Sequence, residues 1–357
     1  MPRSKKIKVF LGAYTNYTNA QNLNCRALAH HLDKDKFIVY TLDLYSGDLS
    51  TISGSGIHLF RCFRPHSISK YFGYMWGIWC CHVAYLPKGE LWQFNRLLLK
   101  IFRKRSFCTH EAILDDKAVQ QAIQSFGNFA HTVDALTFTA RWYPITNFLS
   151  NYNKDKHGIV YENKTLYLGV DSDRFKTVER PKQMLQQVIC IASLIERKNL
   201  YDYLKLAQKF PEIKFLMAGN GPEKKQLEKY IHESNILNVQ FLGTISHNRL
   251  SEILPHTQLH ILPSRSEGFP KVTLETAAAG VPSLVYNDYG AGEWITHDKN
   301  GWVVHSFDDM VAIIKSLQID HEKLEYVSNE AIKLAETFDW KVKVKEWEGV
   351  IKNCQET

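Results

Sequence analysis

Short runs of apolar and β-branched residues alternate with helical stretches along most of the chain. The first series opens with KIKVFLGAY, which predicts a strand that ends in a turn at Gly12, followed by a predicted helix over residues 22–32 and the strand FIVYTLDLY. The series continues with the strand HVAYLP, a helix near residues 90–102, the strand RSFCTHE, a further helix and the strand DALTFTA. Strands that alternate with helices predict a parallel sheet covered by helices.

A second series of the same kind begins after the polar segment YLGVDSDRF, which we interpret as a linker. Its predicted elements are QQVICIASL, a helix over residues 201–209, IKFLMAGNGP, PEKKQLEKYIHES, NVQFLG, NRLSEILPH, QLHILPS, KVTLETAAAG and PSLVYN. A chain of 357 residues has room for two buried cores. We therefore expect an α/β protein with Rossmann-like domains over residues 1–168 and 169–338, and a final helix over 339–357 that packs back on the first domain.

The composition argues against several classes of protein. The seven cysteines form no C-x-x-C pair and show no metal-ligand spacing with histidines, so we expect neither disulfides nor a zinc site, and a reducing cytoplasm fits best. The N-terminal segment lacks the apolar core of a signal peptide. The longest weakly charged stretch, residues 71–86, is shorter than the roughly 20 apolar residues of a spanning helix.

The charge is distributed unevenly along the chain. Residues 1–175 carry 22 Lys and Arg against 13 Asp and Glu, whereas the remainder carries 22 against 24. Basic side chains in the first half stand among aromatic ones: Arg61, Phe63, Arg64, Lys70, Tyr71, Phe72, Arg103, Lys104 and Arg105. This mixture suits an anionic membrane surface or a phosphorylated acceptor, and an ordinary solvated face is the alternative. We expect no nucleic-acid partner.

The most informative stretch is SRSEGFPKVTLETAAAG, which follows the predicted strand QLHILP. Pro270 suits the first position of a helix, and Gly280 suits the helix end. The free N–H groups at the helix start, including those of Phe269 and Lys271, would lie at the positive end of the helix dipole. The stretch therefore predicts a diphosphate site.

Two glutamates stand eight positions apart in this stretch, Glu267 in the loop and Glu275 on the helix. One carboxylate can face a sugar while the other accepts hydrogen bonds from ribose hydroxyls. The alternative is that both are solvated and that Glu267 only favours the helix N-terminus. The surrounding strand, loop and helix pattern favours the binding role.

Residues 187–304 resemble the retaining nucleotide-sugar glycosyltransferases of family 4 (group 1), which have the GT-B fold. The resemblance rests on IASLIERKN, FLMAGNGPE, FLGTIS, LPSRSEGFPKVTLETAAAGVP and YGAGEWITHDKNGWVV, which occur in that family's order and spacing. The first half of the chain matches in general outline only. The resemblance implies two Rossmann-like domains that face each other across an interdomain cleft.

The resemblance also implies roles for single residues. Glu267 corresponds to the glutamate near the donor sugar, Glu275 to the one that binds ribose, and Lys198 to the lysine that neutralises the donor diphosphate. A fixed cation stabilises the negative charge of the departing diphosphate, so no metal is needed. The family commonly has an arginine five residues before this lysine, where the chain has Ser193. Arg197, Lys271 and Arg265 are the candidates to supply that cation, or are surface charges.

Glycines and one further glutamate complete the predicted donor site. Gly219 and Gly221 follow a predicted strand and open a helix, where missing side chains allow close backbone approach. Gly268 belongs to the EGFP loop, and Glu293 is a minor contact by resemblance. Gly12, after the first strand, is expected in a bare loop that lets the donor phosphate approach.

His110 and Glu111 are expected at the carboxyl end of a strand, where open α/β sheets bind ligands. We take His110 as the acceptor-side catalytic candidate because a histidine of the family often lies at a comparable strand end; a structural role is the alternative. Asp115 and Asp116 lack a D-x-D spacing and are expected to begin a helix rather than to bind metal.

Together these features predict transfer of a sugar from a UDP- or GDP-sugar to a glycan or lipid-linked acceptor in surface polysaccharide or glycoconjugate biosynthesis, and the resemblance implies that the transfer proceeds with retention. We expect no cofactor and no metal, and a cytoplasmic location or a peripheral one at the inner face of the membrane. A catalytically silent GT-B partner subunit is the first alternative, motivated by Ser193. A nucleotide-sugar epimerase is the second.

Overall fold

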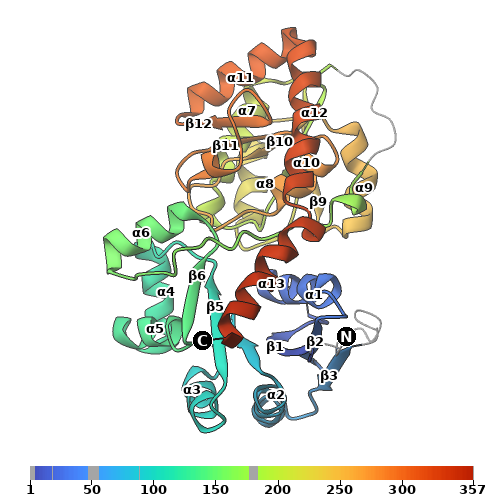
Figure 1. The fold of residues 1–357 in the computed structure, drawn as a ribbon. Coiled ribbons are helices and arrows are strands. Elements are labelled where there is room, and N and C mark those ends of the chain that lie inside the picture. The colour runs from blue at the N-terminus through green and yellow to red at the C-terminus, as the bar shows by residue number, and fades with distance from the viewer. Residues whose placement is uncertain (1–4, 18, 47–55, 88, 177–183, 357) are drawn as a thin grey trace. The chain divides into compact units, whose positions relative to one another are not determined.

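The computed structural model describes residues 5–17, 19–46, 56–87, 89–176 and 184–356 (Figure 1). The chain folds into two units, one of residues 1–169 with 340–357 and one of residues 170–339. The first four residues, part of the segment in which we expect no signal peptide, lie outside the described residues. The cleft expected between the domains stays a prediction.

The first unit is built on a six-stranded parallel sheet with the order β3-β2-β1-β4-β5-β6. Its strands are β1 (Ile7–Tyr14), β2 (Phe37–Asp43), β3 (Ile57–Arg61), β4 (Val83–Tyr85), β5 (Arg105–His110) and β6 (Arg141–Pro144). Its helices are α1 (Ala20–His31), α2 (His66–Cys80), α3 (Trp92–Ile101), α4 (Asp116–Phe126), α5 (Phe129–Leu136), α6 (Asn147–His157) and α13 (Trp340–Glu356). This strand order defines a doubly wound sheet.

The C-terminal helix α13 belongs to the first unit, although it is the last element of the chain. Its fully buried Trp347 lies with its ring centroid 5.3 Å from that of Tyr85 on β4 and 6.5 Å from that of Phe107 on β5. Trp340 packs over Gly169, where an added Cβ would lie 2.6 Å from the indole ring. Burial of these aromatic rings fixes the helix on the sheet.

The second unit repeats the arrangement with the order β12-β11-β10-β7-β8-β9. Its strands are β7 (Gln187–Ile191), β8 (Lys214–Ala218), β9 (Val239–Gly243), β10 (Leu259–Leu262), β11 (Ser283–Tyr286) and β12 (Gly301–Val304). Its helices are α7 (Leu200–Lys209), α8 (Lys224–Glu233), α9 (His247–Ile253), α10 (Val272–Ala278), α11 (Phe307–Ile319) and α12 (His321–Thr337), with short 3₁₀ turns η1 (Ser172–Arg174), η2 (Glu196–Lys198), η3 (Leu254–His256) and η4 (Ala291–Glu293). The α/β prediction with two parallel sheets is confirmed.

Some predicted elements are wrong in detail. The segment DALTFTA is not a strand: its first three residues end α5, and the edge strand β6 begins only at Arg141. Helix α10 begins at Val272, so Pro270 lies two residues before the helix rather than at its first position. The helix end is as predicted, since Gly280 has φ +69° and Val281 N–H donates to the Thr276 carbonyl in a Schellman arrangement.

All seven cysteines are free thiols. Among the described helices, none combines the length and apolar composition that crossing a membrane requires.

Candidate functional site

The candidate site of the second unit lies at the point where its strand order reverses. Strands β7 and β10 are neighbours in the sheet, although β8 and β9 come between them in the sequence. In doubly wound sheets, ligands bind outside the carboxyl ends of two such strands, because the connections leave a crevice there. The loop after β7 carries Arg197 and Lys198, and the loop after β10 carries Glu267.

These three predicted residues are brought together by direct contacts. Glu267 is only 7% exposed, and its carboxylate accepts hydrogen bonds from both cations. Arg197 Nη1 lies 3.0 Å from Oε2 and also donates to the Ser266 carbonyl at 2.7 Å, while Lys198 Nζ contacts Oε1. One carboxylate therefore holds two cations, which leaves a net positive charge for an anionic ligand.

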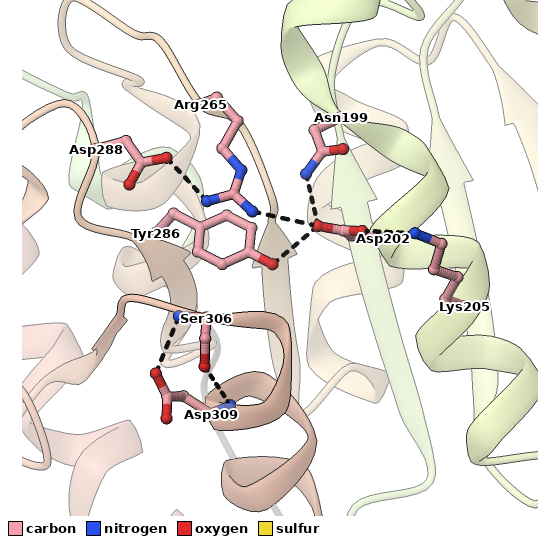
Figure 2. A network of polar contacts seen from close by, with 8 residues as sticks. All are labelled: Asn199, Asp202, Lys205, Arg265, Tyr286, Asp288, Ser306 and Asp309. Carbon is pink, nitrogen blue, oxygen red and sulfur yellow. Dashed lines mark hydrogen bonds and ion pairs between the residues drawn. The ribbon is translucent and has the colours of Figure 1, made fainter.

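A second polar network ties the same two loops to the rest of the unit (Figure 2). The Arg265 guanidinium lies over the Tyr286 ring, 3.6 Å from its centroid, and pairs with Asp288 at 2.9 Å and Asp202 at 3.6 Å. Tyr286 donates to Asp202 at 2.9 Å, and Asn199 donates to the same carboxylate oxygen at 2.7 Å. Arg265 is thus a positioning residue in this structure, and its charge is already matched by two carboxylates.

Figure 2 also shows why the neighbouring helix α11 begins where it does. Ser306 and Asp309 form a reciprocal capping box, in which the serine hydroxyl accepts from the Asp309 N–H and the aspartate accepts from the Ser306 N–H. This satisfies two amides that the helix start would otherwise leave without partners.

Helix α10 places Glu275 in its first turn, where the side chain is partly buried. His247 at the start of α9 lies 3.9 Å from it, from Nε2 to Oε1. Burial lowers the pKa of His247, although the Glu275 charge opposes that shift. No sequence pattern pointed to His247, because 28 positions separate it from Glu275. Lys271 is the residue before α10, and the predicted diphosphate contact of its amide and that of Phe269 stays a prediction.

The side chain of Phe269 belongs to an aromatic cluster beneath the loop rather than to an open surface. It is 8% exposed, and its ring centroid lies 4.8 Å from that of Trp294 and 5.7 Å from that of Phe338. Gly268 is half-buried beside it, and Glu293 stands in the 3₁₀ turn η4 just before Trp294. Their donor contacts stay predictions.

Gly219 and Gly221 follow β8 and precede α8, as the sequence predicts. Both glycines lie against the backbone of the loop after β7. A Cβ added at Gly219 would lie 1.8 Å from the carbonyl oxygen of Ala192, and a Cβ added at Gly221 would lie 2.3 Å from the carbonyl oxygen of Leu194. These glycines therefore let two loops of the protein approach each other, which fixes the segment that leads to Lys198.

The first unit has a cavity of about 400 Å³ at its own reversal point, lined by Asn19, Gln21, Pro87, His110, Glu111 and Leu136 among others. His110 is almost fully buried at the end of β5. Its Nδ1 lies 2.9 Å from the Tyr161 hydroxyl and its Nε2 2.7 Å from the Leu136 carbonyl oxygen. Burial lowers the pKa of His110 to about 4. Both nitrogens have protein partners, so this geometry favours the structural alternative, and a catalytic role stays a prediction.

Gly12 is not in a loop, contrary to expectation. It lies inside β1, is buried, and faces Leu86, whose side chain would be 2.6 Å from an added Cβ. The missing side chain allows β1 to pack against Leu86, the residue that follows β4, and the predicted phosphate contact stays a prediction. Asp115 caps α4 by accepting from the Ala118 N–H, which agrees with the expected helix start. Among the described residues, no group of three or more His, Cys, Asp or Glu is arranged to hold a metal.

Residues 171–334, nearly the whole of the second unit, match the family model described as Glycosyl transferases group 1. The second unit therefore matches this glycosyltransferase family, and the resemblance seen in the sequence is confirmed.

Solved structures share the fold over almost the whole chain. Sucrose-phosphate synthase from Thermosynechococcus elongatus superposes with a TM-score of 0.79 at 13% identity, over 98% of this chain and 99% of that one. The Anabaena HepE protein in complex with UDP and glucose gives 0.77 at 15% identity, over 97% and 100%. The predicted GT-B fold is thereby confirmed.

Curated relatives match over shorter stretches. Over 94 residues the chain is 37% identical to 2-deoxystreptamine N-acetyl-D-glucosaminyltransferase from Niallia circulans. The matched stretch covers 26% of this chain and 24% of that protein. Over 209 residues it is 27% identical to a GDP-mannose-dependent alpha-(1-6)-phosphatidylinositol monomannoside mannosyltransferase from Mycobacterium tuberculosis, covering 50% and 54%. The chain spans about half or less of the length of these relatives.

Proposed function

We propose that the chain transfers a sugar from a nucleotide-sugar donor, bound in the second unit, to a glycan or lipid-linked acceptor. The observation that carries this proposal is the pairing of Glu267 with both Arg197 and Lys198 at the reversal point of the sheet. Relatives named for nucleotide sugars support it: one solved neighbour holds UDP and glucose, and one curated relative is GDP-mannose-dependent.

In this proposal each group of the site has one task. Lys198 and Arg197 neutralise the diphosphate as it gains charge. Arg197 replaces the positive charge of the arginine that the family commonly has at the position of Ser193. Glu267 holds these cations and contacts the donor sugar, while Glu275 accepts hydrogen bonds from the ribose hydroxyls. Because fixed side-chain cations balance the leaving group, we propose that the reaction needs neither metal nor cofactor.

We further propose that the anomeric configuration is retained. The acceptor hydroxyl attacks C1 on the face from which the diphosphate departs, the bond between C1 and the phosphate oxygen breaks, and a phosphate oxygen takes the acceptor proton. A role in surface polysaccharide or glycoconjugate biosynthesis, in the cytoplasm or at the inner face of the membrane, fits relatives such as the phosphatidylinositol monomannoside mannosyltransferase.

The test is product analysis with UDP-, GDP- and ADP-linked sugars, simple glycosides as acceptors, and EDTA throughout. The proposal expects release of one nucleoside diphosphate and a glycoside whose anomeric proton, read by NMR, has the configuration of the donor. Isomerised donor without nucleotide release would favour an epimerase instead. Binding without any turnover would favour a silent partner subunit.

A further inference from the structure

Helix α2 of the first unit exposes apolar side chains that its own fold leaves uncovered. One face packs on the sheet, where Gly77 and Gly73 lie directly against Phe10 and Phe60. On the opposite side Ile68, Tyr71, Phe72 and Trp79 are 52%, 42%, 48% and 65% exposed. Their spacing of three, four and eleven residues from Ile68 places them on one stripe of the helix. A helix that is apolar on both faces normally has a second apolar neighbour.

The neighbouring helix α3 extends this stripe. Figure 1 shows α2 and α3 side by side at one end of the unit, and the ring pairs Tyr71–Phe94 and Trp79–Phe102, with centroids 5.0 and 5.9 Å apart, join them. Leu97 and Ile101 of α3 are 54% and 59% exposed. We call the exposed side chains Ile68, Tyr71, Phe72, Trp79, Leu97 and Ile101, with Arg96 and Lys100 beside them, the α2–α3 face.

The segment that contains α2 and α3 carries almost only positive charge. Residues 57–105 contain nine Lys and Arg but one acidic residue, Glu90, which pairs with Lys70 at 3.4 Å. Arg61, Arg64, Arg96, Lys100, Arg103 and Arg105 are all exposed. This segment alone carries a larger excess of positive charge than the whole chain, whose net charge is +7. Charge complementarity therefore favours an anionic partner.

We infer that the α2–α3 face docks on the surface of a bilayer that contains anionic lipid. Tryptophan and tyrosine beside aliphatic residues suit the boundary between headgroups and acyl chains, where α2 can lie flat. The surrounding cations can reach lipid phosphates. This inference goes beyond the proposed transfer reaction and does not depend on it.

The experiment is co-sedimentation of the full chain with vesicles of phosphatidylcholine alone or with about 30% phosphatidylglycerol. Wild type is expected to bind only the anionic vesicles, and less as salt rises from about 0.1 to about 0.5 M. The double variant Phe72→Ser, Trp79→Ser should bind at least roughly tenfold more weakly. The double variant Arg96→Gln, Lys100→Gln should bind roughly 25-fold more weakly, because each lost charge is expected to weaken vesicle binding about fivefold.

Matched controls come from the second unit. Leu237 and Ile319 are 88% and 84% exposed, so Leu237→Ser with Ile319→Ser removes comparable apolar surface, and Lys225→Gln removes an exposed charge. These variants should bind like wild type, and circular dichroism checks that all variants are folded. Equal binding of all variants, or binding without anionic lipid, would overturn the inference.

The two classes of variant also separate a bilayer from a soluble polyanion. Binding that falls in the charge variant alone, with the aromatic variant unaffected, would contradict insertion of the stripe. Nucleotide binding measured without lipid should be unchanged in every variant. A chain that binds vesicles but no nucleotide would therefore refute the transfer proposal and leave the docking face standing.

Discussion

At the scale of single residues, the two cations on Glu267 differ in a way that sets their expected importance. Lys198 is 11% exposed, whereas Arg197 is 47% exposed, so water screens the arginine more strongly. The buried lysine should therefore supply most of the stabilisation of a departing diphosphate.

Replacement of Lys198 by Met is expected to lower kcat for nucleotide release on the order of 100-fold, because one fixed charge at the leaving group is lost. Arg197→Met should lower it by roughly tenfold, in keeping with its exposure. Steady-state kinetics with EDTA present measures both, and melting curves show whether each variant is folded. An unaltered kcat in Lys198→Met would rule out its assigned role.

His110 gives the first unit a pH dependence of defined sign. In the folded protein its pKa is about 4, below the usual value of 6.5. Between pH 6.5 and pH 4, the unfolded chain therefore binds a proton at His110 and the folded chain does not. The contribution of His110 to the free energy of unfolding is complete above pH 6.5 and is lost as the pH falls towards 4. The total loss is about 3 kcal/mol.

Hydrogen exchange of the β5 amides, corrected for the intrinsic rate, reports the opening free energy of this strand locally. Wild type should lose protection as the pH falls from 6.5 to 4, and His110→Gln should show a flatter profile. Parallel profiles in the two proteins would show that another group titrates. The local readout is needed because the second unit has its own buried histidine, His260, with a lowered pKa.

At the scale of elements, the loop after β7 is held by backbone contacts as well as by side chains. Gly221→Ala would push a Cβ to 2.3 Å from the Leu194 carbonyl oxygen. A backbone clash of this size should cost about 2–3 kcal/mol of stability and displace the segment leading to Lys198. Gly292→Ala is the matched control, because its Cβ meets only an ordinary contact at 3.5 Å from Asn287. Equal melting temperatures for the two variants would contradict the clash.

Most elements of the second unit follow from their sequence. Strands such as β8 and β10 are short apolar runs between polar turns, and their period and length separate them from the helices. The first unit was harder to predict, because β6 has only four residues and because the segment DALTFTA before it combines apolar and threonine residues that also suit a strand. Helix α2 was not predicted because both its buried and its exposed sides are apolar, so no polar face recurs at the helical period.

The candidate site was predictable only in part. The motif located Glu267, Glu275 and Lys198, but not the contact of His247 with Glu275, which depends on how α9 meets α10. It also misplaced Gly12, since a glycine in a strand and a glycine in a loop look alike in sequence. Long-range packing decides both cases.

At the scale of the whole molecule, two sheets of identical strand order carry different surfaces. The first 175 residues have a formal net charge of +9 and the remainder −2, from 22 against 13 and 22 against 24 charged side chains. The uncovered aromatic stripe also lies in the first unit. We therefore assign donor chemistry to the second unit and encounter with an anionic acceptor surface to the first, as proposals.

We propose that the second unit binds a nucleotide through Glu275 and without a metal ion. Calorimetry with UDP, GDP and ADP in EDTA, on wild type, Glu275→Ala and the exposed-helix control Glu228→Ala, tests it directly. One nucleotide is expected to bind wild type and the control equally, and Glu275→Ala at least roughly tenfold more weakly, because a hydrogen bond to a charged group is lost. Binding that requires magnesium, or that is unchanged in Glu275→Ala, would contradict it.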